Sequence, residues 1–135
     1  MAIVPLAIGS DGSLIEAAVA AGAQGVVVDA FGRGNLPRPV VGAVAQALEK
    51  GVTVVVTTRT GSGRGAAWPT LAERGVLSGE ALDALEARLL LMAALPITRD
   101  PVALQSWIGV LSGKVGAKVM EPRSGPQPPA EPATP

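Results

Sequence analysis

The sequence predicts a small three-layer α/β/α domain built on a parallel four-stranded sheet. Short β-branched runs alternate along the chain with longer segments of helical periodicity, the order typical of parallel sheets covered by helices on both faces. Two of these runs, Gly25–Asp29 and Val52–Thr58, are almost continuous in valine or threonine, as expected for strands buried on both sides. Hydrophobic residues make up 48% of the chain, which is enough for one buried core.

The chain opens with a short strand and a first helix. Ile3–Ile8 is apolar, and Pro5 indicates an edge strand or a frayed one, because proline cannot donate to a neighbouring strand. Ser13 followed three residues later by Glu16 has the spacing of a capping box. We therefore expect a helix from this box to Gly22, a usual residue after a helix end.

Two further helices and a brief strand are predicted by local patterns in the middle of the chain. Pro39–Lys50 predicts a helix between the two valine-rich strands, with its apolar residues on one face. Val76–Leu77 predicts a brief fourth strand. Asp83 and Glu86 then have capping-box spacing and open a helix that ends at Pro96. That helix has one apolar side, formed by Leu85, Leu89, Met92 and Leu95.

The last predicted helix and the end of the chain differ sharply in composition. Asp100-Pro101 is a helix N-cap followed by proline, and it predicts a helix over Val102–Leu111 that frays at Gly113. Glu121–Pro135 holds six of the twelve prolines and no large apolar residue, so it cannot bury enough surface to order itself. We expect a domain over residues 1–115 and a disordered Pro-rich tail over 116–135.

The residue types that the chain lacks exclude several function classes. There are no cysteines, histidines or tyrosines, which excludes disulfides, thiolate or imidazole metal sites and a Ser-His-Asp triad. Lys+Arg and Asp+Glu are 11 each, and this balance argues against a nucleic-acid or anionic-membrane surface. We expect no metal and no cofactor, and acid–base chemistry would rest on Asp, Glu or Lys alone.

No targeting signal is visible in the sequence. The first residues lack a basic segment, and the longest apolar run, Leu89–Leu95, is far shorter than the ~20 residues that a membrane span needs. A cytoplasmic protein is therefore the expectation.

The candidate site is the turn that follows the strand Gly25–Asp29. Gly32 and Gly34 predict a sharp turn, and Asn35 follows it, in the crevice where parallel sheets bind ligands. Asn35 is a ligand-binding amide, the cap of the next helix, or both. Asp29 is either catalytic or an acceptor of N–H bonds from the turn. The glycines do not continue into a dinucleotide fingerprint, because Pro37 occupies the third glycine's place.

A second glycine-rich segment follows the strand Val52–Thr58. Gly61–Gly65 is flanked by Arg59 and includes Arg64, so a cradle for a phosphate or carboxylate is conceivable. The alternative, a surface loop with solvated arginines, is favoured because no Gly-Lys-Ser/Thr follows.

Taken together, these segments resemble the C-terminal domain of bacterial-type L-asparaginases, a family that includes asparaginase/glutaminases. The matching stretches extend from Asp11 to Trp107, and the strand–GxGN–Leu/Pro turn followed by Thr-Thr-Arg is the most specific. In sequence order they are DGSLIEAAVAAGAQGVVVDAFGRGNLP, LEKG with VTVVVTTR, GVLSG, LDALEARLLLMAAL and RDPVALQSW.

The resemblance implies a function for the family and a limited share of it for this chain. Family enzymes hydrolyse L-asparagine to aspartate and ammonia with a threonine nucleophile, and their catalytic residues belong to an N-terminal domain that the matching stretches do not include. The C-terminal domain supports oligomers, and its GxGN asparagine, here Asn35, reaches a neighbouring subunit's active site. Gly32, Gly34, Asp29 and Arg59 would support that turn. An acid that some members bring to the site has no counterpart, since Trp68 falls near its place.

Three roles follow from the resemblance and stay open. The chain is a non-catalytic asparaginase domain that pairs with an N-terminal domain chain and forms homo-oligomers, or a stand-alone module that binds L-asparagine or L-aspartate, or the remnant of a split asparaginase gene. Whether it takes part in an enzyme is therefore left open by the sequence.

Overall fold

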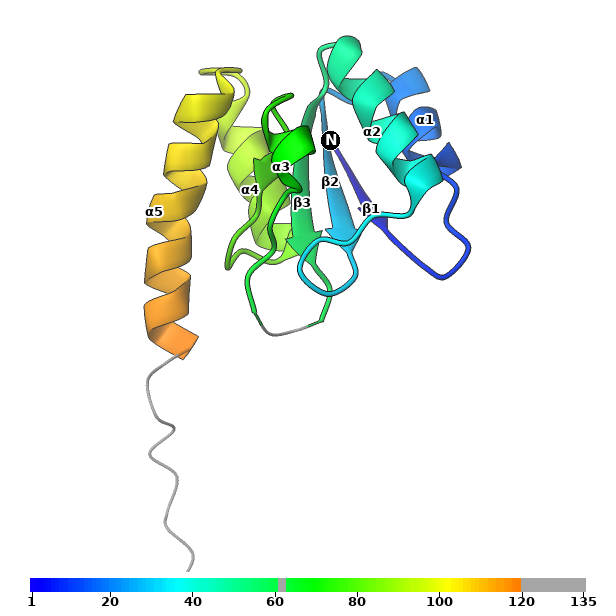
Figure 1. The fold of residues 1–135 in the computed structure, drawn as a ribbon. Helices are drawn as coiled ribbons and strands as arrows, with labels where there is room; N and C mark the ends of the chain where they lie inside the picture. Colours follow the sequence, from blue (N-terminus) through cyan, green and yellow to red (C-terminus); the bar gives the residue numbers. More distant parts are fainter. Residues whose placement is uncertain (61–62, 120–135) are drawn as a thin grey trace, which may run out of the picture.

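Four parallel strands form one sheet in the order in which they occur along the chain, β1-β2-β3-β4 (Figure 1). The computed structural model describes residues 1–60 and 63–119. The strands are β1 (Ala2–Pro5), β2 (Gly25–Ala30), β3 (Thr53–Thr58) and β4 (Leu77–Ser78). The helices are α1 (Ser13–Ala20), α2 (Arg38–Glu49), α3 (Pro69–Ala72), α4 (Ala84–Ala94) and α5 (Pro101–Val119).

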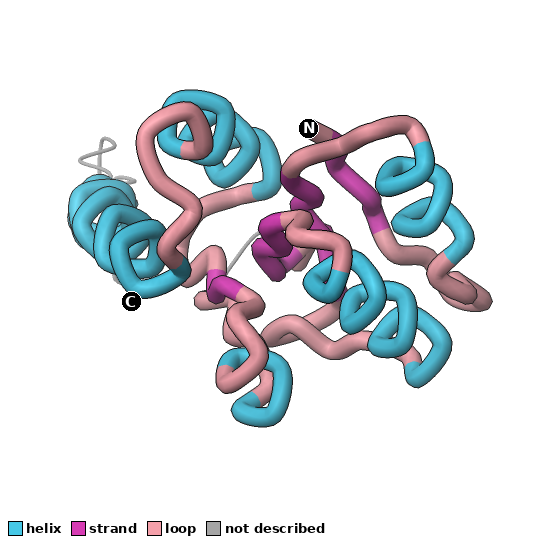
Figure 2. Tube along the Cα trace, turned by 90° about the horizontal axis from the view of Figure 1, so that it is seen from above, coloured by secondary structure: helices cyan, strands magenta, loops and turns pink. Residues whose placement is uncertain are grey.

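The sheet lies between two layers of helices, which confirms the predicted α/β/α class. Seen from above, α1 and α2 lie on one side of the strands and α4 and α5 on the other (Figure 2). The predicted edge position of the first strand is also confirmed, because within the described part of the chain β2 is the one strand that pairs with β1. β1 ends at Pro5 rather than at Ile8, whose side chain is 99% exposed.

Valines from β2 and β3 form the centre of the core on both faces of the sheet. Val26 and Val28 face α1 and α2, whereas Val27 faces α4 and α5. The register pairs Val27 with Val55, so each side of the sheet receives matching valines from both strands. These side chains are fully buried. Each contributes about 1.5 kcal/mol or more by leaving water, which explains why both strands are continuous in β-branched residues.

The start of α1 differs from the predicted capping box. Gly12, in a left-handed conformation with φ of 93°, is the N-cap, and no side chain caps the helix. The carboxylate of Asp11 instead accepts a hydrogen bond of 3.0 Å from the Ser13 backbone N–H. Ser13 and Glu16 therefore lie within the helix. The box prediction was wrong because Asp11 accepts the Ser13 N–H, which the Glu16 carboxylate would bind in a capping box.

The hydrogen bonds from Ser13 also affect the ionisation of Asp11. The Ser13 side chain, and then its backbone N–H, hold the pKa of Asp11 below its ordinary value of 3.8. A lowered pKa favours the folded state above the ordinary value, and this contribution is lost as the pH falls through the lowered pKa. Because Asp11 is at the surface, the contribution is small.

At α4 the predicted capping box is confirmed. Asp83 accepts a hydrogen bond of 2.8 Å from the Glu86 backbone N–H, and Glu86 accepts one of 2.9 Å from that of Asp83. The buried face of this helix consists of Ala87, Leu91 and Ala94.

Most of the apolar side predicted for α4 faces solvent. Leu85, Leu89 and Met92 are each more than half exposed, and only Leu95 of the predicted four is buried. We call these three exposed residues the α4 band. An exposed apolar stripe along a whole helix is typical of a surface that a partner covers.

Helix α5 begins as predicted and ends later. Asp100 accepts hydrogen bonds from the backbone N–H groups of Val102 and Ala103, as an N-cap does. The helix passes Gly113 and continues to Val119, so residues 116–119 of the predicted tail are helical. The rest of that predicted tail, 120–135, lies outside the described residues. No helix within residues 1–60 and 63–119 has the length and apolar character to cross a membrane.

The capping box of α4 gives a stability prediction. Asp83→Ala removes the acceptor for the Glu86 N–H, and we expect the free energy of unfolding to fall by about 1 kcal/mol. Urea denaturation followed by circular dichroism measures this change. Glu73→Ala is the matched control, because Glu73 is an exposed acid at the C-terminal end of α3 whose carboxylate, among the described residues, caps no helix N-terminus; it should change stability by less than about 0.5 kcal/mol. Equal losses in the two variants would contradict the capping role.

Candidate functional site at the carboxyl end of the sheet

The turn after β2 is built by two glycines in positive-φ conformations. Gly32 has φ of 49° and Gly34 has φ of 107°. Both the Gly34 and Asn35 backbone N–H groups donate to the Phe31 carbonyl, at 3.0 and 2.8 Å. A Cβ on Gly34 would overlap the carbonyl oxygen of Ala66. Glycine is therefore required at residue 34 by its backbone angle and by close packing.

Two neighbouring segments hold this turn in place. The Thr58 hydroxyl, at the end of β3, donates a hydrogen bond to the Gly32 carbonyl. The Ala66 backbone N–H donates to the Arg33 carbonyl at 2.8 Å. The turn is thus fixed from β3 on one side and from the segment around Ala66 on the other.

Asn35 is at the surface of this fixed turn. Its side chain is exposed, and within the described part of the chain nothing hydrogen-bonds to its amide. Helix α2 begins at Arg38 with Pro37 as N-cap and without a side-chain cap, so the alternative that Asn35 caps this helix is wrong. The amide, with two donors and one acceptor, is available to a ligand or a partner.

Asp29 is bound by a hydroxyl rather than by backbone N–H groups of the turn. The Thr57 Oγ1 donates to Asp29 Oδ1 at 3.2 Å, and the Asp29 backbone carbonyl accepts from the Leu6 N–H at 3.0 Å. Thr57 is fully buried. Its hydroxyl therefore serves to orient the Asp29 carboxylate and cannot reach a substrate.

The side chain of Arg59 links β1 to the turn after β2. Its Nη1 donates to the Leu6 carbonyl, and its guanidinium carbon lies 5.8 Å from the centre of the Phe31 ring, within cation–π range. Arg59 also borders an open hollow lined by Asp29, Thr58, Arg59, Asp83, Ala84 and Leu85. Arg59 therefore has a structural role and also borders this hollow.

The structure groups the predicted residues into two places. Asp29 and Arg59 line the hollow, whereas Gly32, Gly34 and Asn35 form the adjacent turn. The second glycine-rich segment does not add an arginine to the hollow, because Arg64 pairs with Glu80 at 3.2 Å. Gly61 and Ser62 lie outside the described residues.

Sequence reasoning missed the residues that support the turn and complete the hollow. Thr57 and Thr58 belong to the Thr-Thr-Arg segment, which carried a signal, but Ala66 had none. Asp83 was assigned only a capping role, yet it also lines the hollow. Across residues 1–60 and 63–119, no group of three or more His, Cys, Asp or Glu side chains could hold a metal ion.

The fold and the turn define an α/β domain that presents an amide at the carboxyl edge of its sheet. Residues 1–108 match the Glutaminase/Asparaginase C-terminal domain family. The chain is 42% identical over 99 residues to L-asparaginase 2 of Bacillus subtilis (strain 168), covering 73% of this chain and 26% of that protein. It is 35% identical over 108 residues to an L-asparaginase of Bacillus licheniformis, covering 74% of this chain and 33% of that protein.

A solved structure agrees with these relatives. The probable cytoplasmic L-asparaginase from Campylobacter jejuni superposes with a TM-score of 0.75 at 30% identity, over 79% of this chain and 34% of that chain. The chain thus spans about a quarter to a third of the length of these three relatives. It belongs to the Glutaminase/Asparaginase C-terminal domain family, as its sequence motifs indicate.

The Gly34 turn can be tested by substitution. Gly34→Ala should lower the free energy of unfolding by at least about 2 kcal/mol, because it adds an overlap with Ala66 to the strain of a positive φ. Gly9→Ala is the matched control, since Gly9 has φ of 90° with no atom near its missing Cβ. Thermal and urea unfolding of both variants measure the difference. A Gly34→Ala loss no larger than that of Gly9→Ala would contradict the close packing of this turn.

Proposed function

We propose that this domain serves an amide hydrolase of the asparaginase type as its C-terminal domain, and that L-asparagine is turned over only when a catalytic domain is present. Family membership and the partial coverage of relatives named L-asparaginase support this proposal. The single observation that carries it is the Asn35 amide, which is exposed on a rigid turn and bonds to no other described residue.

In the proposed role, Asn35 gives its amide to the active site of a neighbouring subunit. An amide can donate to a substrate carboxylate or accept from a substrate ammonium group, and it does both without a change of charge. Gly32 and Gly34 would set the direction of Asn35. Asp29 and Arg59 would fix the strand end and the ring of Phe31 behind it, so the chemistry itself would rest with the other domain.

Partners in this proposal are a catalytic domain and further copies of the chain. The α4 band leaves Leu85, Leu89 and Met92 exposed, a surface that an isolated domain is expected to bury by association. We propose residues 1–115 as the domain that makes these contacts, with 116–135 as an appended tail. The cytoplasm, named for the Campylobacter jejuni relative, is the proposed compartment.

An ammonia-release assay tests the proposal. The purified chain alone should give no ammonia from L-asparagine above background. Mixed with the N-terminal remainder of the Bacillus subtilis L-asparaginase 2, it should raise release, and Asn35→Ala should cut that gain at least about tenfold, as expected when a hydrogen bond to a charged group is lost. Gln46→Ala, an exposed amide on α2, is the matched control and should leave the gain unchanged.

Three outcomes of this assay would contradict the proposal. They are turnover by the chain alone at rates typical of enzymes, no gain on mixing, and a gain that Asn35→Ala leaves unaltered. The first would place a complete active site in this chain, and the other two would remove the role of the domain or of its amide.

The hollow beside Arg59 favours one alternative, an amino-acid-binding module. Asp29 and Asp83 could bind an ammonium group there and Arg59 a carboxylate. In that case L-asparagine or L-aspartate would give measurable heat by calorimetry with the chain alone, and Asp83→Asn would abolish it. No heat at millimolar ligand is the outcome that we expect, because Arg59 already donates to Leu6 and lies near Phe31.

A further inference from the structure

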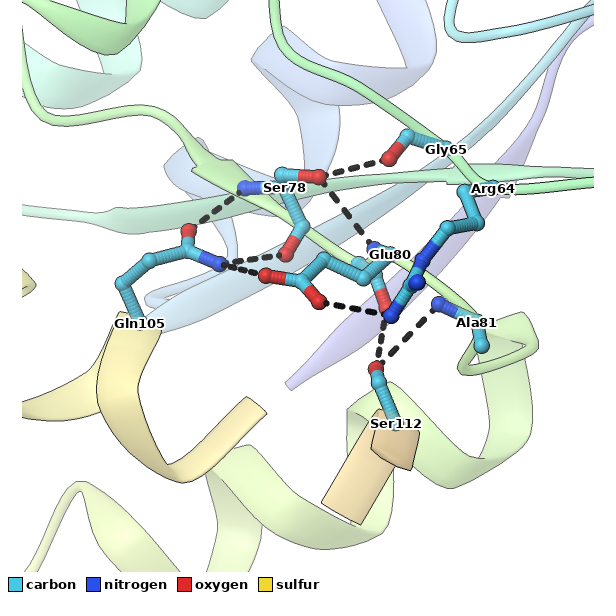
Figure 3. A network of polar contacts seen from close by, with 8 residues as sticks. Arg64, Gly65, Ser78, Glu80, Ala81, Gln105 and Ser112 are labelled. Atoms are coloured by element: carbon cyan, nitrogen blue, oxygen red, sulfur yellow. Dashed lines mark hydrogen bonds and ion pairs between the residues drawn. The ribbon is translucent and has the colours of Figure 1, made fainter. Parts of the chain in front are cut away.

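A network of polar contacts joins β4 to α5 away from the turn (Figure 3). The Ser78 backbone N–H donates to Gln105 Oε1 at 2.9 Å, and Gln105 Nε2 donates to the Ser78 carbonyl at 3.1 Å. The Gln105 amide thus hydrogen-bonds to both the backbone N–H and the carbonyl of Ser78, as a neighbouring strand would. The backbone of Ser78 is thereby fixed against α5.

The hydroxyl of Ser78 extends this network to a third segment. Ser78 Oγ donates to the Gly65 carbonyl at 2.6 Å and accepts from the Glu80 backbone N–H at 3.2 Å. The Gly65 N–H in turn donates to the Glu80 carbonyl at 2.7 Å. We call residues 64–66, which lie between β4 and the turn after β2, the strap.

The strap is pressed closely against the end of β3. A Cβ on Gly65 would lie 3.1 Å from the Val56 carbonyl oxygen and 3.2 Å from the Thr57 Cα. On its other side, the Ala66 N–H donates to Arg33, and the Ala66 carbonyl occupies the space that a side chain on Gly34 would need. The strap therefore has little room to shift without moving the turn that presents Asn35.

We propose that Ser78 is a positioning residue for Asn35, acting through Gly65, Ala66 and Arg33. The functional importance of this positioning rests on the function proposed above, in which the Asn35 amide enters a neighbouring active site. Ser78 does not itself reach the amide. Its hydroxyl fixes the Gly65 carbonyl, the next residue donates to the turn, and the turn sets the direction of the Asn35 side chain.

Other contacts on the strap are weaker candidates for this role. Arg64 pairs with Glu80 at 3.2 Å, but the Arg64 side chain is 61% exposed, and exposed ion pairs contribute little. Gln105 also donates to Glu80 Oε1 at 3.2 Å, which orients the acid rather than the strap. The short hydroxyl bond from Ser78 is the side-chain contact that holds the strap's backbone in the described residues.

Amide hydrogen exchange by NMR on the full chain tests the proposal. Ser78→Ala should speed exchange at Ala66, Gly34 and Asn35 at least about fivefold, the factor expected from one lost hydrogen bond. The Asn35 side-chain amide resonances should shift, and exchange at Val27, in the sheet centre, should stay at its parent value. Ser106→Ala, at an exposed serine of α5, is the matched control and should change none of these.

A conservative variant separates the hydroxyl from general packing. Ser78→Thr keeps the hydroxyl and should keep the three turn and strap amides protected. Loss of protection in Ser78→Thr, or faster exchange at Ala66 with Gly34 and Asn35 unchanged, would overturn the proposal. This readout uses the chain alone, so it is distinct from a failure of the proposed function, which would show as an Asn35→Ala variant that still supports ammonia release.

Discussion

Three segments of backbone approach the end of β3 so closely that a side chain in place of their glycines would meet tight contacts. A Cβ on Gly79 would lie 2.6 Å from the Thr57 Cγ2, one on Gly65 would lie 3.1 Å from the Val56 carbonyl oxygen, and one on Gly34 would lie 3.2 Å from the Val56 Cγ1. The turn, the strap and the exit of β4 therefore pack directly on the same two residues of one strand. Because these segments pack closely on one another and on β3, the position of Asn35 depends on where β3 ends.

The valine-rich strands make this close packing possible. β2 and β3 are buried on both faces, so their ends are held by two helical layers and not by the turn itself (Figure 2). Thr57 and Thr58 then change the strand's chemistry at its last two residues. One hydroxyl orients Asp29 inside the sheet, and the other fixes Gly32 at its edge. The core thus keeps the strands in place, and the hydrogen bonds at the end of β3 fix the turn that sets the direction of the Asn35 amide.

The architecture could be predicted from the sequence because the strands and the helices each have a characteristic pattern of apolar residues. The alternation of strands and helices, the edge position given by Pro5 and the Asp83 box are local patterns, and the structure confirms them. The Ser13 box failed because its spacing competes with an acid at residue 11. The end of α5 was missed because a single glycine, Gly113, does not stop a helix, its cost being only about 1 kcal/mol.

The site was less predictable than the fold. The glycines and the asparagine of the turn were visible, because positive φ and turn chemistry leave a compositional mark. The contacts that hold the turn were not visible. Thr58 is 26 residues from Gly32 in sequence, and Ala66 meets Arg33 because the strap packs against the end of β3. Such backbone contacts between distant segments do not require particular residue types, so no local sequence pattern predicts them.

Thiol labelling tests whether Asn35 faces a neighbouring active site once the chain is assembled with a catalytic domain. The chain has no cysteine, so Asn35→Cys creates a single reactive group on the turn. Its alkylation rate is measured with and without the N-terminal remainder of the Bacillus subtilis relative, after sedimentation has shown that a complex forms. We expect strong protection at residue 35 and none for Gln46→Cys on α2. Equal alkylation of the cysteine at residue 35 with and without the bound partner would contradict it.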